Sequence, residues 1–149
     1  MYGGSTHAKA ETDWISHPIR HARDAARVPT VLIVDDDAKY RRALTAFLDA
    51  SFDLDVVADT GSAEEAVALA GHLRPDAVVV DVAMPIVSGF ELAERLRSVL
   101  PELVIVLVTG NVRGIDPETM RLLGNATLVA KGDPLPVENA LRTLSRRSP

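Results

Sequence analysis

Short runs of apolar residues alternate with amphipathic segments from residue 30 to residue 147. The runs are rich in β-branched residues without polar alternation, which is typical of strands buried on both faces of a parallel sheet. The predicted strands are residues 31–34, 54–58, 77–81, 104–108 and 127–130. The segments between them repeat apolar residues every three or four positions, which predicts helices. Five strands and five helices therefore follow one another in strict alternation.

Start and stop signals set the bounds of these helices. The first follows Asp35-Asp36-Asp37 and runs over residues 38–50. Ser62 and Glu65 have the spacing of a capping box, so the second helix begins there and ends before Pro75. The remaining helices are expected at residues 89–99, 117–123 and 135–144. Such alternation predicts an α/β fold: a doubly wound five-stranded parallel sheet with helices on both faces.

Polar residues stand where four of the five strands end, and only the second strand contributes none. They are Asp35 and Asp36, Asp81, Thr109, and Lys131. The ends of parallel strands lie along one edge of the sheet, where open α/β sheets bind ligands. We therefore expect three carboxylates, a hydroxyl and an amine to lie close together.

This combination of side chains suits a phosphoryl group. Three neighbouring carboxylates repel one another and call for a cation. Oxygen ligands with few protein contacts favour Mg²⁺, which also accepts a phosphate oxygen. Lys131 adds a second positive charge and Thr109 a hydrogen-bond donor, while a carboxylate acts as the nucleophile and becomes an acyl phosphate.

Residues 30–147 resemble a response-regulator receiver domain of two-component signalling. The matching pieces are Val34-Asp35-Asp36, then Asp81-Val82-Ala83-Met84-Pro85 with Gly89 beyond, then Val108-Thr109, and finally Lys131. Their order and spacing follow the family along nearly the whole segment. The resemblance implies a flavodoxin-like fold with strand order 2-1-3-4-5.

The resemblance also implies a role for each residue of the cluster. Asp81 is the implied phosphoacceptor, and Thr109 and Lys131 bind the phosphoryl oxygens. The implied Mg²⁺ site consists of Asp36 as a direct ligand, Asp35 acting mainly through water, Asp81, and the backbone carbonyl of Ala83. The donor would be a histidine kinase or a histidine phosphotransfer protein. The domain itself is a signalling module rather than an enzyme, with only self-catalysed phosphorylation and dephosphorylation.

Three positions depart from the family pattern. Gly132 follows the lysine where the family commonly has proline, and Gly110 follows Thr109 in place of the common alanine. Leu128 stands where an aromatic residue often takes part in the switch. We therefore expect the response to phosphorylation to come mainly from the backbone after Thr109.

Two other functions are alternatives to this one. A phosphohydrolase of the haloacid-dehalogenase type would use Asp35 as nucleophile and Asp37 as acid, but no cap segment or late acidic pair is present in the sequence. Asp37 is more simply explained as the cap of the helix at Ala38. The other alternative is a receiver-like interaction module that never carries phosphate. A P-loop enzyme is excluded because no G-x-x-x-x-G-K motif occurs.

Composition and charge bear on the kinds of partner and the cellular location that are expected. The 149 residues are 47% hydrophobic, contain no cysteine and carry a net charge of −5. A charge of this sign argues against direct nucleic-acid binding, and the longest apolar run, Leu103 to Val108, is too short to span a bilayer. The expected location is the cytoplasm.

Residues 1–29 differ in character from the rest and are expected to form an N-terminal extension. We expect it to be partly disordered, with one short helix from about Pro18 to Arg27. No output domain is recognisable, so the signal would pass to a downstream protein partner or to an output domain outside this chain. A homodimer is a further option.

Overall fold

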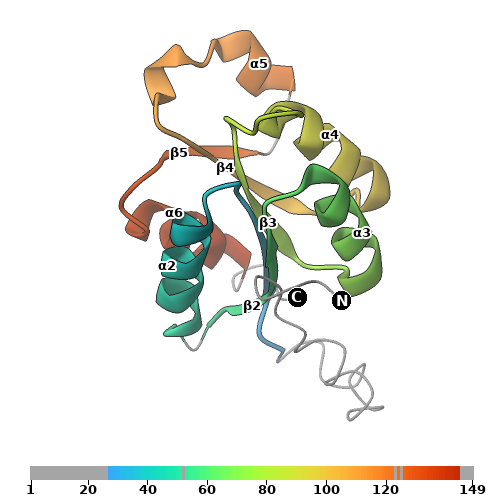
Figure 1. The fold of residues 1–149 in the computed structure, drawn as a ribbon, viewed down its shortest axis with the longest axis vertical. Helices are drawn as coiled ribbons and strands as arrows, with labels where there is room; N and C mark the ends of the chain where they lie inside the picture. Colours follow the sequence, from blue (N-terminus) through green and yellow to red (C-terminus); the bar gives the residue numbers. More distant parts are fainter. Residues whose placement is uncertain (1–26, 52, 123, 125, 145–149) are drawn as a thin grey trace.

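The computed structural model describes residues 27–144 except 52, 123 and 125, and Figure 1 shows its course. The extension over residues 1–26, with its expected helix, lies outside the described residues. The strands are β1 (Thr30–Val34), β2 (Asp55–Thr60), β3 (Ala77–Asp81), β4 (Val104–Thr109) and β5 (Thr127–Ala130). The helices are α2 (Ala38–Asp49), α3 (Ala63–Leu73), α4 (Gly89–Val99), α5 (Pro117–Leu122) and α6 (Leu135–Leu141). Two 3-10 turns, η3 (Val112–Gly114) and η4 (Arg142–Leu144), complete the described elements.

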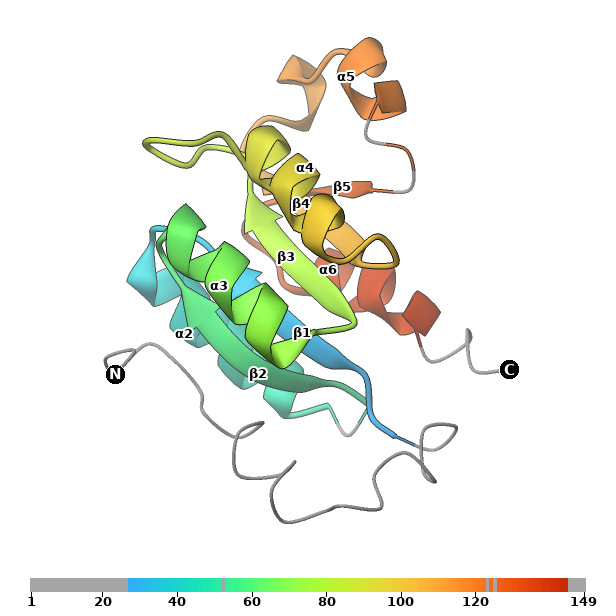
Figure 2. The ribbon, with the colours of Figure 1, turned by 90° about the vertical axis from the view of Figure 1, so that its right-hand side faces the viewer.

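The five strands form one parallel sheet in the order β2-β1-β3-β4-β5, which confirms the predicted topology. Helices α3 and α4 cover one face of the sheet, and α2 and α6 cover the other (Figure 2). The β4–β5 connection, with η3 and α5, extends beyond the edge of the sheet (Figure 1). The sheet is thus covered on both sides, as parallel sheets require.

Two apolar clusters hold these layers together, one on each face of the sheet. Alternate residues of a strand face opposite sides, so Leu32 belongs to the cluster under α3 and α4 while Ile33 belongs to the cluster under α2 and α6. All residues of β1, β3 and β4 are buried. This explains why their sequences are continuous apolar runs, and it fixes their carboxyl ends on a rigid frame.

Strand β2 and the last helix depart from the expected bounds, whereas strand β5 has the bounds that were predicted. Strand β2 begins one residue later than predicted and continues to Thr60, because Asp59 and Thr60 pair with Ile33 and Val34 of β1. The last helix ends at Leu141 and passes into the turn η4. Strand β5 is paired on one side only, and its residues are half-buried or exposed.

The described residues begin at Arg27, whose side chain forms an ion pair with Asp76 next to the start of β3. Its guanidinium donates two hydrogen bonds to Asp76, of 2.7 and 2.6 Å, and the backbone N–H of Thr30 donates to the same carboxylate at 2.8 Å. Asp76 directly precedes β3, so this contact joins the entry of β1 to the entry of its neighbour. No described helix is long and apolar enough to cross a membrane.

Candidate functional site

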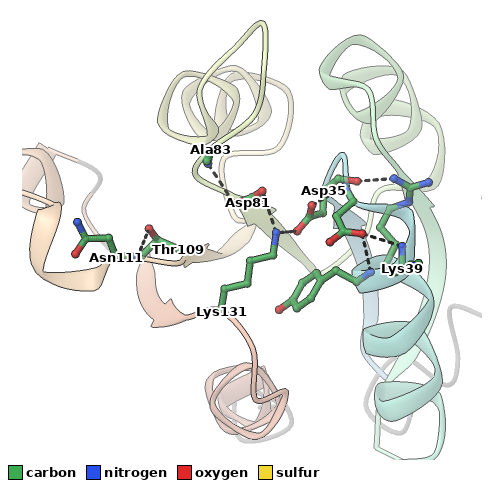
Figure 3. Close-up of polar contacts among 10 residues, drawn as sticks. Asp35, Lys39, Asp81, Ala83, Thr109, Asn111 and Lys131 are labelled. Carbon is green, nitrogen blue, oxygen red and sulfur yellow. Dashed lines mark hydrogen bonds and ion pairs between the residues drawn. The ribbon is translucent and has the colours of Figure 1, made fainter.

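Carboxylates from β1 and β3 meet a lysine from β5 at the carboxyl edge of the sheet. The ammonium Nζ of Lys131 lies 2.7 Å from Oδ2 of Asp35 and 3.2 Å from Oδ2 of Asp81 (Figure 3). Asp35 and Asp81 are 1% and 5% exposed. The lysine follows the last residue of β5 and reaches across the end of β4 to both acids. The predicted convergence of these three residues is therefore confirmed in the structure.

Asp36 completes a group of three acids that can hold a metal ion. One carboxylate oxygen from each of Asp35, Asp36 and Asp81 can be chosen so that all three lie within 4.8 Å of one another. Asp36 is exposed while the other two acids are buried, so the group opens to solvent on one side. An all-oxygen set that is open to water fits Mg²⁺, which keeps several of its waters when bound.

Both oxygens of Asp35 are fixed by contacts. Oδ1 accepts a hydrogen bond of 2.8 Å from the backbone N–H of Asp37, and Oδ2 pairs with Lys131. Burial raises the pKa of Asp35 and the nearby Asp81 charge adds to this, although Lys131 and the Asp37 N–H act in the opposite direction. Burial alone would lower the pKa of Lys131, but its pairs with Asp35 and Asp81 outweigh burial and raise it. Lys131 therefore supplies the acid cluster with a cation of the protein's own.

Asp81 is held by the loop that follows its strand. Its Oδ1 accepts a hydrogen bond of 3.1 Å from the backbone N–H of Ala83, while Oδ2 faces Lys131. The first residue of α4, Gly89, packs against this turn: an added Cβ would lie 2.4 Å from the carbonyl oxygen of Asp81 and 2.7 Å from Cα of Val82. Only glycine permits that approach without moving the backbone. Gly89 thus lets α4 begin directly behind the acid.

Thr109 reaches the same edge but its hydroxyl is used locally. Oγ1 accepts a hydrogen bond of 3.1 Å from the backbone N–H of Asn111, at the start of the β4–β5 connection (Figure 3). Thr109 is 6% exposed and pairs with Ala130, the residue before Lys131. The expected position of Thr109 is therefore correct. In this structure its hydroxyl holds the loop after β4 and makes no hydrogen bond to Asp81.

Asp37 caps helix α2, as the sequence suggested. Its Oδ1 accepts hydrogen bonds from the backbone N–H groups of Lys39 and Tyr40, at 3.0 and 3.3 Å. Its carboxylate is thus occupied at the helix N-terminus, which favours a structural role over that of an acid in a hydrolase.

Sequence reasoning missed a buried ion pair behind the acids, and the expectation that strand β2 contributes nothing was wrong. Nε of Arg41 donates a 2.9 Å hydrogen bond to Asp59 near the end of β2, and Nη1 donates one of 2.5 Å to the backbone carbonyl of Asp35. Both side chains are buried. Helix α2 and strand β2 therefore support the backbone that carries Asp35. The only sequence signal was the presence of charged residues inside two otherwise apolar patterns.

A flavodoxin-like sheet with an acid cluster and a lysine at its carboxyl edge defines the class to which this protein belongs. The model of the family described as "Response regulator receiver domain" matches residues 31–133. The chain belongs to this family, whose members act in bacterial two-component signalling.

Relatives and solved structures agree with that assignment. The DNA-binding transcriptional activator DevR/DosR of Mycobacterium tuberculosis is 42% identical over 79 residues, which is 53% of this chain and 36% of that protein. A protein-glutamate methylesterase/protein-glutamine glutaminase of Agrobacterium fabrum is 35% identical over 105 residues, covering 70% of this chain and 30% of that protein. The response regulator domain of Thermotoga maritima CheB superposes with a TM-score of 0.67 at 26% identity, covering 82% of this chain and 96% of that domain. The chain thus spans about a third of the length of these two curated relatives.

The roles of Asp36 and Asp37 can be separated by alanine substitution. Asp36→Ala should weaken Mg²⁺ binding by roughly tenfold or more, because losing a ligand costs at least as much as losing one of its outer partners. Without metal the same change should raise the melting temperature, since it removes one of three mutually repelling charges. Asp37→Ala should instead cost about 0.5–2 kcal/mol of folding free energy through the lost cap.

Metal titration and thermal melting with and without Mg²⁺ measure both effects. The assignment of Asp36 as a ligand fails if Asp37→Ala weakens Mg²⁺ binding as strongly. The repulsion argument fails if Asp36→Ala melts clearly below the parent in the absence of metal.

Proposed function

We propose that the chain receives a phosphoryl group on Asp81, with Mg²⁺ bound by Asp35, Asp36, Asp81 and the carbonyl of Ala83, and that this changes a partner-binding surface. The observation that carries the proposal is the position of Lys131, which pairs with both buried acids. An ammonium held between a candidate nucleophile and a candidate metal ligand suits a group that brings several negative oxygens. The family assignment gives independent support.

The residues divide the chemistry among them. A carboxylate oxygen of Asp81 attacks the phosphorus atom. The bond between phosphorus and the imidazole nitrogen of the donor breaks, and its electron pair stays on that nitrogen. Bound Mg²⁺ would neutralise phosphoryl oxygens during the transfer. Lys131 supplies a second positive charge beside Asp81, where the phosphoryl oxygens would arrive. The Ala83 N–H holds the other Asp81 oxygen, so the acid is oriented before the donor arrives.

The change then passes to the β4–β5 connection. The Thr109 oxygen accepts the Asn111 N–H, which leaves the hydroxyl proton free to be donated to a phosphoryl oxygen, and movement of Thr109 towards that oxygen would pull on the loop after β4. Residues 110–114 follow at once and include two glycines, so their backbone can adjust at little cost. Leu128 is half-buried and packs against the α3–α4 side of the core. The proposed readout surface is the segment 116–123, strand β5 and helix α6.

The partners follow from the class of protein. A histidine kinase or a histidine phosphotransfer protein is the proposed donor. One relative is a DNA-binding activator and another an esterase, and both are longer than this chain. We propose that the signal passes to a downstream protein or to an output domain, and that residues 30–147 form the receiver unit with residues 1–29 as an extension. Self-association is a second route for the signal.

Phosphoryl transfer from a small acyl-phosphate donor tests the proposal directly. In the presence of Mg²⁺ we expect one alkali-labile phosphoryl group per chain, detected as a mass increase of the intact protein. Chelation of the metal should prevent it, because the three acids would then repel the donor. A chain that binds Mg²⁺ but never gains mass would instead support an interaction module that works without phosphate.

Thr109→Val tests the relay from the site to the loop. Valine keeps the shape of threonine but can neither accept from Asn111 nor donate to a phosphoryl oxygen. We expect Asp81 still to accept phosphate, while the amide shifts of residues 110–131 caused by a phosphate mimic become much smaller than in the parent. Amide chemical shifts recorded with and without the mimic provide the measurement. Equal shifts in the two proteins would show that Thr109 is not the relay.

A further inference from the structure

The aromatic ring of Tyr40, in the first turn of α2, lies beside the lysine of the site. Nζ of Lys131 is 4.7 Å from the centre of the ring. This is within the ~6 Å over which an aromatic face attracts a cation. The two residues are 91 positions apart in sequence. The Lys131 side chain is 24% exposed, so much of the ammonium is already out of water where such an attraction is strongest.

The ring is placed by the same cap that orders the acids. Asp37 donates its N–H to Oδ1 of Asp35 and accepts the N–H of Tyr40. The Tyr40 ring contacts Lys131, and Lys131 pairs with Oδ2 of Asp35. These four contacts form a continuous chain that begins at one carboxylate oxygen of Asp35 and ends at the other. The position of the ammonium is therefore tied to helix α2 as well as to the carboxylates.

The hydroxyl of Tyr40 has no comparable role. It is buried and has no hydrogen-bond partner among the described residues. Burial raises the pKa of Tyr40 to about 12, so the hydroxyl stays protonated at neutral pH and the ring remains neutral. The contact with Lys131 belongs to the ring, which phenylalanine shares.

We infer that the Tyr40 ring is a positioning group for Lys131, giving its ammonium a second place of attraction when the carboxylates are taken by metal. Asp35 and Asp81 both pair with Lys131. Once they bind Mg²⁺ their oxygens are less available to the lysine, and the phosphoryl group has yet to arrive. The Tyr40 ring keeps the ammonium of Lys131 beside the carboxylates in the state in which the metal is bound and the phosphoryl group is not. This inference rests on the proposed function, because it assigns Tyr40 a part in phosphoryl transfer.

Ring and hydroxyl can be separated by substitution. Tyr40→Phe keeps the ring, whereas Tyr40→Leu and Tyr40→Met keep only apolar bulk against the core. Phe47→Leu is a matched control, because Phe47 lies two turns further along α2 and packs, half-buried, against the same cluster as Tyr40. Two aliphatic variants guard against one of them folding poorly.

The first readout is independent of phosphorylation. The ε-methylene protons of Lys131 should resonate upfield of their usual position in the parent and in the Tyr40→Phe and Phe47→Leu proteins, because of the ring current. In the Leu and Met variants at position 40 this displacement should disappear. Unchanged Lys131 resonances in those two variants would overturn the inference, even if the chain accepted no phosphate at all.

The second readout is the initial rate of phosphorylation by a small acyl-phosphate donor. We expect Tyr40→Leu and Tyr40→Met to lower it by roughly three- to tenfold, the range of a partly desolvated cation–π contact. The Mg²⁺ affinity of these variants should stay within about twofold of the parent, and the Tyr40→Phe protein should keep the parental rate of phosphorylation. Equal losses in the Phe and Leu variants would assign the effect to the hydroxyl and overturn the inference. A parent protein that takes no phosphate would contradict the proposed function, while the resonances of Lys131 would still decide on the ring.

Discussion

Asp81→Asn is expected to abolish phosphoryl transfer to this protein. Asparagine has nearly the shape of aspartate, but its neutral amide cannot attack phosphorus or balance the charge of Mg²⁺. No mass increase should therefore follow incubation with the donor and metal. The fold should survive, because the change removes one of three crowded charges and Lys131 keeps its shorter pair with Asp35.

Asp37→Asn is the control at the same edge of the sheet. Asparagine caps a helix about as well as aspartate, so α2 should be unaffected and the chain should accept phosphate at close to the parental rate. A hydrolase that used Asp35 as nucleophile and Asp37 as acid would behave in the opposite way. It would lose activity on Asp37→Asn and keep a phosphoryl group on the Asp81→Asn protein. Intact-mass measurements of the two variants thus separate the two functions.

Arg41→Met should be the most destabilising single change near the site. It removes the guanidinium beside the buried carboxylate of Asp59 and a hydrogen bond to the backbone of Asp35. Removing one partner of a buried ion pair typically costs about 3–5 kcal/mol, because the remaining buried charge loses the opposite charge beside it. Mg²⁺ binding should weaken as well, since the Asp35 backbone loses its support. Urea unfolding and metal titration measure the two effects.

Two further variants make the Arg41 result specific. Arg42→Met changes an exposed arginine at the next position and should alter stability by less than about 0.5 kcal/mol. The double variant Arg41→Met with Asp59→Leu should recover much of the loss, because a hydrophobic pair can replace a buried ion pair. If the double variant is as unstable as the sum of the single changes, the cost comes from lost packing rather than from the buried charge.

The elements of the fold and the edge that carries the site were predictable from local patterns. Strands β1, β3 and β4 are buried on both faces, so apolar runs marked them almost to the residue. Ser62 accepts the N–H of Glu65, as the capping motif predicted, and Asp37 caps α2. Strand β2 was less well bounded because its last two residues are polar.

The convergence of the acids with Lys131 was also determined by the sequence. In a parallel sheet all strands point the same way, so residues at their carboxyl ends must share one edge. No side-chain detail is needed for that conclusion. Asp35, Asp81 and Lys131 therefore lie together although up to 96 positions separate them.

Only the tertiary structure decided what supports these residues. Arg41 meets Asp59 because the register of β2 against β1 places Asp59 beside Ile33, under the first turns of α2. The ring of Tyr40 contacts Lys131 because α2 packs on one face of the sheet and Lys131 follows β5, whose Val129 packs against the apolar cluster on that same face. The Thr109 hydroxyl turns to Asn111 rather than to Asp81. Each of these contacts depends on the rotation of a helix or a side chain relative to another element, and such rotations are set by packing across the sheet rather than by the pattern of any one segment.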